Sequence, residues 1–129
     1  MTLKTLPHSF SICKAAETAA IDLSIAFCFV GRTDEEISIV CPTEEVPPKT
    51  LERDDGWRGF RIEGTLDFSL TGILAKLSGI LTDKRIGLFA VSTFNTDYVF
   101  VKEDNFAAAL EALAAAGYDI VWPGGPMSP

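Results

Sequence analysis

The sequence predicts an α+β protein made of two tandem ferredoxin-like units, each with the element order β-α-β-β-α-β and an antiparallel sheet. Three observations lead to this prediction. In the second half of the chain, apolar residues switch between the alternating spacing of strands and the wider spacing of helices. The full order of six elements can be read there, and a fainter copy of it runs through the first half. The 129 residues, 47% of them apolar, are enough for one average domain or two very small units.

The second half opens with a strand and a helix. In residues 57–63, Phe60 and Ile62 alternate with charged neighbours, which is typical of a half-buried strand. Apolar residues then recur at helical spacing over residues 70–81 and form a stripe on one face. The unbroken apolar run 87–91 predicts a central strand that is buried on both faces.

A strand, a helix and a short last strand complete this half. Residues 98–101 form the strand, and Asp104 or Asn105 can cap the next helix. Gly117 is well placed to end that helix, and residues 119–122 form the last strand. We therefore predict a C-terminal unit over residues 62–123 and a proline-rich tail over 124–129.

The first half, residues 1–61, is predicted to be an N-terminal unit whose helices are degenerate. Pro47 and Pro48 shorten any second helix. The strand at residues 57–63 can belong to either unit, and a single irregular α+β domain remains the alternative to a duplication. The predicted segments are a strand at 10–13, a connection of one or two helical turns at 15–23, a strand at 25–30, a charged turn at 31–36 and a strand at 37–41.

Composition and charge exclude several classes of function. A net charge of −7 predicts that the protein repels nucleic acid and anionic lipid. The longest apolar stretch, residues 23–30, is too short to span a membrane, and the N-terminus has no apolar signal core. We therefore expect a cytoplasmic protein.

The sequence offers no recognisable catalytic or cofactor chemistry. Cys13, Cys28 and Cys41 lie in apolar segments without zinc-ligand spacing, so we interpret them as reduced core cysteines. Gly59 and Gly64 have the spacing of a phosphate-binding loop, but a threonine and a leucine follow directly where the motif requires a lysine. We predict a protein that is not an enzyme, with no catalytic residues, no metal and no cofactor.

Two polar segments are the candidate binding residues. One is the turn Thr93, Phe94, Asn95, Thr96 and Asp97, which carries more polar chemistry than a hairpin requires. The other opens the helix at residues 70–81, where free backbone N–H groups can receive an anion. Its residues are Ser69, Leu70, Thr71 and Gly72. Each segment also has a simpler interpretation, as ordinary turn residues and as a helix cap with a packing glycine.

Residues 63–74 and 89–101, with the stretch Ser-Thr-Phe-Asn-Thr-Asp-Tyr at 92–98, resemble the ACT-like domains of the amino-acid sensor class. That class includes small bacterial proteins with two tandem ACT-like units and the animal cytosolic arginine sensor called CASTOR. The resemblance implies a regulatory ligand-binding fold and not a catalyst. It also implies that Thr93, Phe94 and Asp97 contact the ligand, with Ser69 to Gly72 matching more loosely.

We therefore predict a protein that binds a free amino acid or a similar small zwitterion and regulates through a homodimer or a partner enzyme. The N–H groups of Leu70, Thr71 and Gly72 would receive the carboxylate, Asp97 the cation, and Phe94 would form a wall. Because the chain has two units where the sensor has four, a full pocket between units can require a second copy. The alternative is a structural or interaction module that keeps the fold without a ligand.

Overall fold

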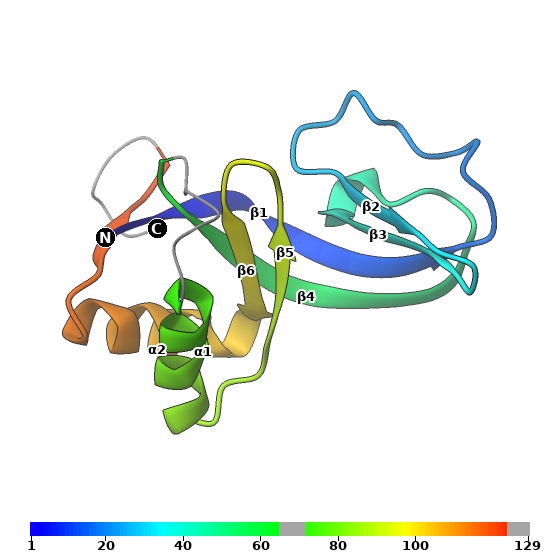
Figure 1. Ribbon diagram of the computed structural model, residues 1–129. Helices are drawn as coiled ribbons and strands as arrows, with labels where there is room; N and C mark the ends of the chain where they lie inside the picture. Colours follow the sequence, from blue (N-terminus) through cyan, green and yellow to red (C-terminus); the bar gives the residue numbers. More distant parts are fainter. Residues whose placement is uncertain (65–71, 124–129) are drawn as a thin grey trace. The chain divides into compact units, whose positions relative to one another are not determined.

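The computed structural model describes residues 1–64 and 72–123 and shows the mixed α+β composition that the sequence predicts (Figure 1). The chain divides into two compact units. We call Met1–Pro7 with Arg58–Pro129 the helical unit, and His8–Trp57 the strand unit. In chain order the elements are β1 (Thr2–Ala15), β2 (Phe29–Arg32), β3 (Ile37–Pro42), the 3-10 helix η1 (Thr43–Glu45), β4 (Thr50–Ile62), α1 (Ile73–Asp83), β5 (Leu88–Ser92), β6 (Asp97–Lys102), α2 (Glu103–Ala115) and β7 (Asp119–Val121).

Strands β1 and β4 contribute residues to both units, because each unit boundary falls inside one of them. The strand order is β2-β3-β1-β4 in the strand unit and β7-β1-β4-β6-β5 in the helical unit. The hairpins are antiparallel, as is β1 with β3, whereas β7 runs parallel to β1 with Thr2 opposite Asp119. In the helical unit, β4 and β7 are the first and the last strand of the predicted β-α-β-β-α-β order. Strand β1 lies between them.

The α+β class and the ferredoxin-like order of the second half are confirmed. The boundary between residues 61 and 62 as a division into two repeats stays a prediction, and so does the tandem repeat itself.

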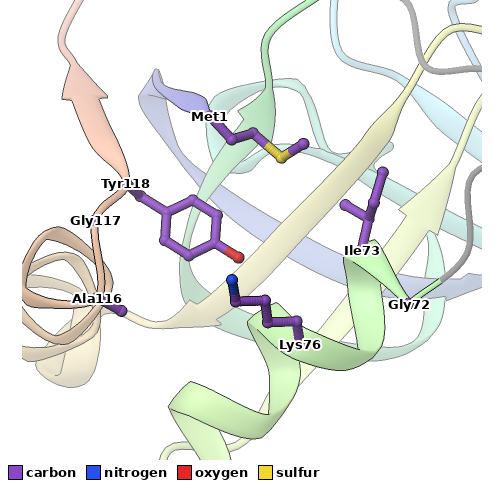
Figure 2. Close-up of a pocket in the computed structure, with 7 residues that line it drawn as sticks. All are labelled: Met1, Gly72, Ile73, Lys76, Ala116, Gly117 and Tyr118. Atoms are coloured by element: carbon purple, nitrogen blue, oxygen red, sulfur yellow. The ribbon is translucent and has the colours of Figure 1, made fainter.

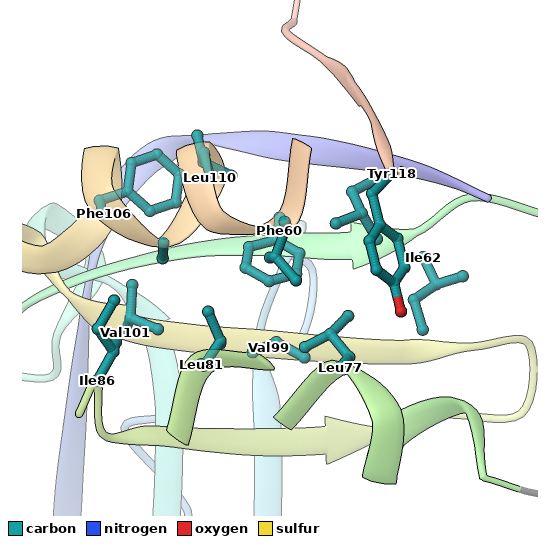
Figure 3. Close-up of a cluster of buried hydrophobic side chains, with 13 residues drawn as sticks. Phe60, Ile62, Leu77, Leu81, Ile86, Val99, Val101, Phe106, Leu110 and Tyr118 are labelled. Atoms are coloured by element: carbon teal, nitrogen blue, oxygen red, sulfur yellow. The ribbon is translucent and has the colours of Figure 1, made fainter. Parts of the chain in front are cut away.

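The core of the helical unit lies between its strands and its two helices (Figure 3). Phe60 and Ile62 of β4 are completely buried, and they contact the same cluster as the buried leucines of α1 and α2. Successive strand residues point to opposite faces, so the alternation predicted for β4 places both helices on one face of these strands. The buried members of this cluster are Leu3, Phe60, Ile62, Leu77, Leu81, Ile86, Val99, Val101, Phe106, Ala109, Leu110, Leu113 and Tyr118.

The strand unit has a smaller core and, within His8–Trp57, no α-helix. Ala15, Ile39 and Cys41 form this core, and half-buried apolar residues pack against it. Cys13, Cys28 and Cys41 are free thiols. The three-residue η1 agrees with the prediction that the prolines at 47 and 48 shorten the second helix.

Two strand predictions are wrong. The segment predicted as a strand at 25–30 becomes extended only at Phe29. Phe27 has a φ of 64°, which interrupts an extended chain, and its ring lies 6.1 Å from the ring of His8 and 6.2 Å from that of Phe10.

The second wrong prediction is the central position of residues 87–91. Strand β5 is the edge of the helical unit, pairs with β6, and alternates between half-buried and exposed residues. Its apolar character has a local cause, because the ring of Phe89 stacks on that of Phe100 with centroids 4.8 Å apart. A short apolar run cannot by itself distinguish an edge strand from a central one.

Helix α2 begins at Glu103 without a side-chain cap, so the predicted cap at Asp104 or Asn105 is wrong. Both Glu103 and Asp104 instead lie in the first turn, where their charge favours the helix dipole. The predicted stop is confirmed: Gly117 has a φ of 105° and donates its N–H to the carbonyl of Ala114. No helix among the described residues is long and apolar enough to cross a membrane.

Candidate functional site

The hairpin turn between β5 and β6 is closed by its own threonines. The Thr93 N–H donates to the Thr96 carbonyl at 2.8 Å, and the Thr93 hydroxyl donates to the same oxygen at 3.1 Å. Thr96 is buried, and its hydroxyl donates to the carbonyl of Ile62 at 2.8 Å. These two predicted ligand residues therefore stabilise the turn and hold it against the end of β4.

The other predicted turn residues differ in exposure. Phe94 is 80% exposed, and Asn95 is exposed as well. Asp97 is half-buried and accepts a hydrogen bond of 2.5 Å from the hydroxyl of Ser92, its partner in the strand register. A ligand cation at Asp97 would have to share the carboxylate with this hydroxyl.

The predicted anion-binding segment is described only at its last residue. Ser69, Leu70 and Thr71 lie outside the described residues. Gly72 is exposed, has a φ of 77°, and accepts the N–H of Lys76 at 2.9 Å as α1 begins. Glycine adopts this left-handed conformation without steric cost, which gives Gly72 a structural reason for its place before the helix. The predicted site as a set of residues stays a prediction.

A pocket of about 300 Å³ lies beside Gly72 (Figure 2). The start of α1 forms one side of it, and the end of α2 with the connection to β7 forms the other. None of the hairpin-turn residues lines this pocket. Its described lining residues are Met1, Gly72, Ile73, Lys76, Ala116, Gly117 and Tyr118.

Among the described residues that line this pocket, Lys76 and Tyr118 have polar side chains, and the sequence patterns did not single out either. Tyr118 is 9% exposed, and its ring belongs to the core of the helical unit. Burial raises the pKa of its phenol, so the hydroxyl keeps its proton near neutral pH. A sequence signal did exist: a lysine within a predicted helix and a tyrosine directly after the helix-ending glycine.

Within residues 1–64 and 72–123, no three His, Cys, Asp or Glu side chains gather in a way that could hold a metal ion. The described residues that line the pocket present apolar surface and two side-chain hydrogen-bond donors, from Lys76 and Tyr118.

Comparison with known proteins places these features in a family. A model of the ACT domain matches residues 52–115, which include β5, β6 and α1. The cytosolic arginine sensor for mTORC1 subunit 1 of Bos taurus is 35% identical over 97 residues, which cover 70% of this chain. That alignment covers 30% of the sensor, so the chain spans about a third of the length of the curated relatives that it matches.

Solved structures share this fold. A protein of Agrobacterium tumefaciens superposes with a TM-score of 0.82 at 30% identity, and the match covers 99% of this chain and 97% of that one. The regulatory subunit of aspartate kinase from Thermus thermophilus superposes with a TM-score of 0.64 at 11% identity. That match covers 91% of this chain and 97% of the kinase subunit, and it shows similarity of fold alone.

Proposed function

Because this chain belongs to the ACT-domain family and is related to the ACT domains of the cytosolic arginine sensor, we propose that it is a non-catalytic regulatory protein that binds a free amino acid or a similar small zwitterion. The observation that carries the proposal is the ACT-domain match over residues 52–115, which spans the helix start and the hairpin turn. We further propose that it acts in the cytoplasm, through a homodimer or a partner enzyme.

The proposed contacts rest on charge complementarity to a zwitterion. A ligand carboxylate would bind the backbone at Ser69, Leu70, Thr71 and Gly72, and its cation would bind Asp97. Phe94, with 80% of its surface exposed, is available as an apolar wall. Thr93, Asn95 and Thr96 would shape the turn that presents these two side chains.

A screen of the twenty amino acids by thermal shift tests the proposal. A ligand that binds the folded state raises the melting temperature, and the rise grows with its concentration relative to Kd. For any ligand found, Asp97→Ala should weaken binding by about 2–5 kcal/mol if the pair is buried, measured by calorimetry. Ser92→Ala, which removes the neighbouring hydroxyl and keeps the carboxylate, is the matched control and should retain binding. An unchanged affinity in Asp97→Ala would refute the assignment of Asp97.

The alternative is a structural or interaction module without a ligand, and two observations favour it. Thr96 is buried in the fold, and Asp97 already accepts a hydrogen bond from Ser92. In that case no amino acid would raise the melting temperature, while size-exclusion chromatography with light scattering would still report a stable assembly.

A further inference from the structure

We propose that the pocket between the start of α1 and the end of α2 binds the carboxylate of a small organic acid, held by the Lys76 ammonium group and the Tyr118 hydroxyl. The inference goes beyond the proposed function, because it assigns a carboxylate site away from Asp97, and it rests on that function only for the identity of the acid as an amino acid. The pocket itself is inferred from the geometry of the helical unit (Figure 2).

The Tyr118 hydroxyl is the observation that points to a ligand. The residue is 91% buried, since 9% of its surface is exposed, and Figure 2 shows its hydroxyl directed into the pocket. It makes no hydrogen bond to any residue that the structure describes. The hydroxyl opens into the pocket, so a ligand acceptor placed there can receive its hydrogen bond.

Lys76 supplies the charge. It lies in the first turn of α1, and its amino group extends towards the Tyr118 hydroxyl across the pocket (Figure 2). No ion pair of Lys76 is formed within residues 1–64 and 72–123. A protonated lysine and a protonated tyrosine are both donors, so the complementary group is an anion that accepts two hydrogen bonds.

The helix dipole does not favour the charge of Lys76 at this position in α1. A helix start carries partial positive charge and favours acidic residues in the first turn. Helix α2 obeys that rule with Glu103 and Asp104, whereas the first turn of α1 has no acidic residue and contains Lys76. Two positive features at one end of α1 repel each other, and an anion between them would relieve that repulsion.

The remaining walls limit the size and the character of the acid. The side chains of Met1 and Ile73 supply apolar surface, and about 300 Å³ is at the small end of ligand pockets. The end of α2, at Ala116 and Gly117, carries partial negative charge and suits an ammonium group. A small amino acid with an apolar side chain would therefore satisfy both ends, whereas a simple carboxylic acid would satisfy one.

The test is a titration monitored by ¹⁵N-resolved NMR with three related probes. L-Leucine carries both charges, 4-methylpentanoate has the carboxylate without the amine, and L-leucinamide has the amine without the carboxylate. We expect L-leucine and 4-methylpentanoate to shift amides of residues 72–76 and 116–118, and L-leucinamide to shift none of them. Lys76→Met and Tyr118→Phe should each weaken binding about tenfold or more, because each removes a hydrogen bond to a charged group.

Lys84→Met is the matched control, since Lys84 lies at the opposite end of α1 and should leave binding unchanged. The spectra of all variants also report whether the fold is retained. The proposal is overturned if no probe shifts these amides at saturating concentration, if L-leucinamide binds as well as the acids, or if both variants bind like the wild type.

Failure of the pocket and failure of the proposed function give different results. If an amino acid from the full panel shifts residues 92–97 and Lys76→Met leaves its binding unchanged, the proposed function stands and the pocket assignment fails. If 4-methylpentanoate binds at residues 72–76 and 116–118 but no amino acid binds, the pocket stands and the amino-acid function fails.

Discussion

The two units of the chain contain the same hairpin, but the segments after the hairpin differ. The turn of the strand unit is closed by Thr33 N–H to the Glu36 carbonyl at 2.9 Å, and that of the helical unit by Thr93 N–H to Thr96 at 2.8 Å. After its hairpin the helical unit forms a helix of 13 residues, whereas the strand unit forms a 3-10 helix of 3 residues. The hairpin therefore does not require a covering helix to keep its geometry.

The cause of the difference is local sequence. Helix α2 is rich in alanine and leucine, which are among the best helix formers. The corresponding part of the strand unit contains Pro47 and Pro48, which lack N–H donors and disfavour helix. The two turn bonds lie 60 residues apart, since 93 − 33 and 96 − 36 both give 60, and this equal offset supports the predicted duplication as a proposal.

Substitutions in the two cores should have the largest effect on the free energy of unfolding. Phe60→Ala removes a completely buried ring from the helical unit and should lower the free energy of unfolding by about 3–5 kcal/mol. Ile39→Ala in the smaller core of the strand unit should cost about 2 kcal/mol, because fewer neighbours lose contacts. Urea titrations monitored by circular dichroism measure both values.

Because β1 and β4 run through both units, we expect each variant to unfold in a single transition. Two separate transitions, with each mutation shifting one of them, would contradict this expectation and show that the units fold independently.

Alkaline pH should affect the strand unit before the helical unit. Burial, with the nearby Cys13 and Cys28 thiols, raises the pKa of Cys41 from 9.0 to about 12. A pKa raised in the folded state gives stability that is present below pH 9 and is lost as the pH rises from 9 to 12. The full loss would be at most about 4 kcal/mol at pH 12, and about half of that near pH 10.5.

Hydrogen exchange between pH 8 and 10.5 should therefore show amides of β3 losing protection before those of α2. Cys41→Ala is the control, because it removes the group with the largest rise in pKa and should reduce the pH dependence of the unfolding free energy, while burial still raises the pKa of Cys13 and Cys28. An equal slope in the two proteins would show that other groups cause the alkaline loss.

Two glycines, one in a strand of each unit, should respond differently to substitution by alanine. A Cβ on Gly59 of β4 would lie 2.6 Å from two ring atoms of Phe100, which is completely buried. Gly59→Ala should therefore cost about 2 kcal/mol through overpacking. A Cβ on Gly31 of β2 would meet nothing within 4 Å, so Gly31→Ala should change the melting temperature little. Equal effects at the two positions would refute the packing explanation for Gly59.

The sequence predicts those elements that are determined by the residues of their own segment. Helix α2 and its end at Gly117 result from residue propensity and one left-handed glycine. The first seven residues could not be read as a strand, because Lys4 and Pro7 break the apolar pattern while β1 is held by pairing with β7 and β4. The edge position of β5 depends on strand order, which no single segment encodes.

The candidate site is less predictable than the fold for the same reason. Lys76 and Tyr118 are 42 positions apart, 118 − 76, and they line one pocket because the packing of α1 and α2 brings them together. The chemistry of the hairpin residues predicts ligand contacts, but Thr93 and Thr96 donate their hydroxyls to backbone carbonyls. A polar turn in sequence therefore does not separate ligand contacts from bonds within the fold.

The smallest expected effect concerns the hydroxyls of the two turns. Thr96→Val keeps the shape of the side chain and removes its buried 2.8 Å hydrogen bond to the Ile62 carbonyl. It should cost about 1 to 1.5 kcal/mol. Thr33→Ala, in the exposed turn of the strand unit, removes bonds from the N–H groups of Glu35 and Glu36, which water can replace, and should cost about 0.5 kcal/mol. Denaturant midpoints at constant m measure this difference in the free energy of unfolding. If Thr33→Ala lowers the free energy of unfolding as much as Thr96→Val or more, the bond to Ile62 does not anchor the hairpin of the helical unit.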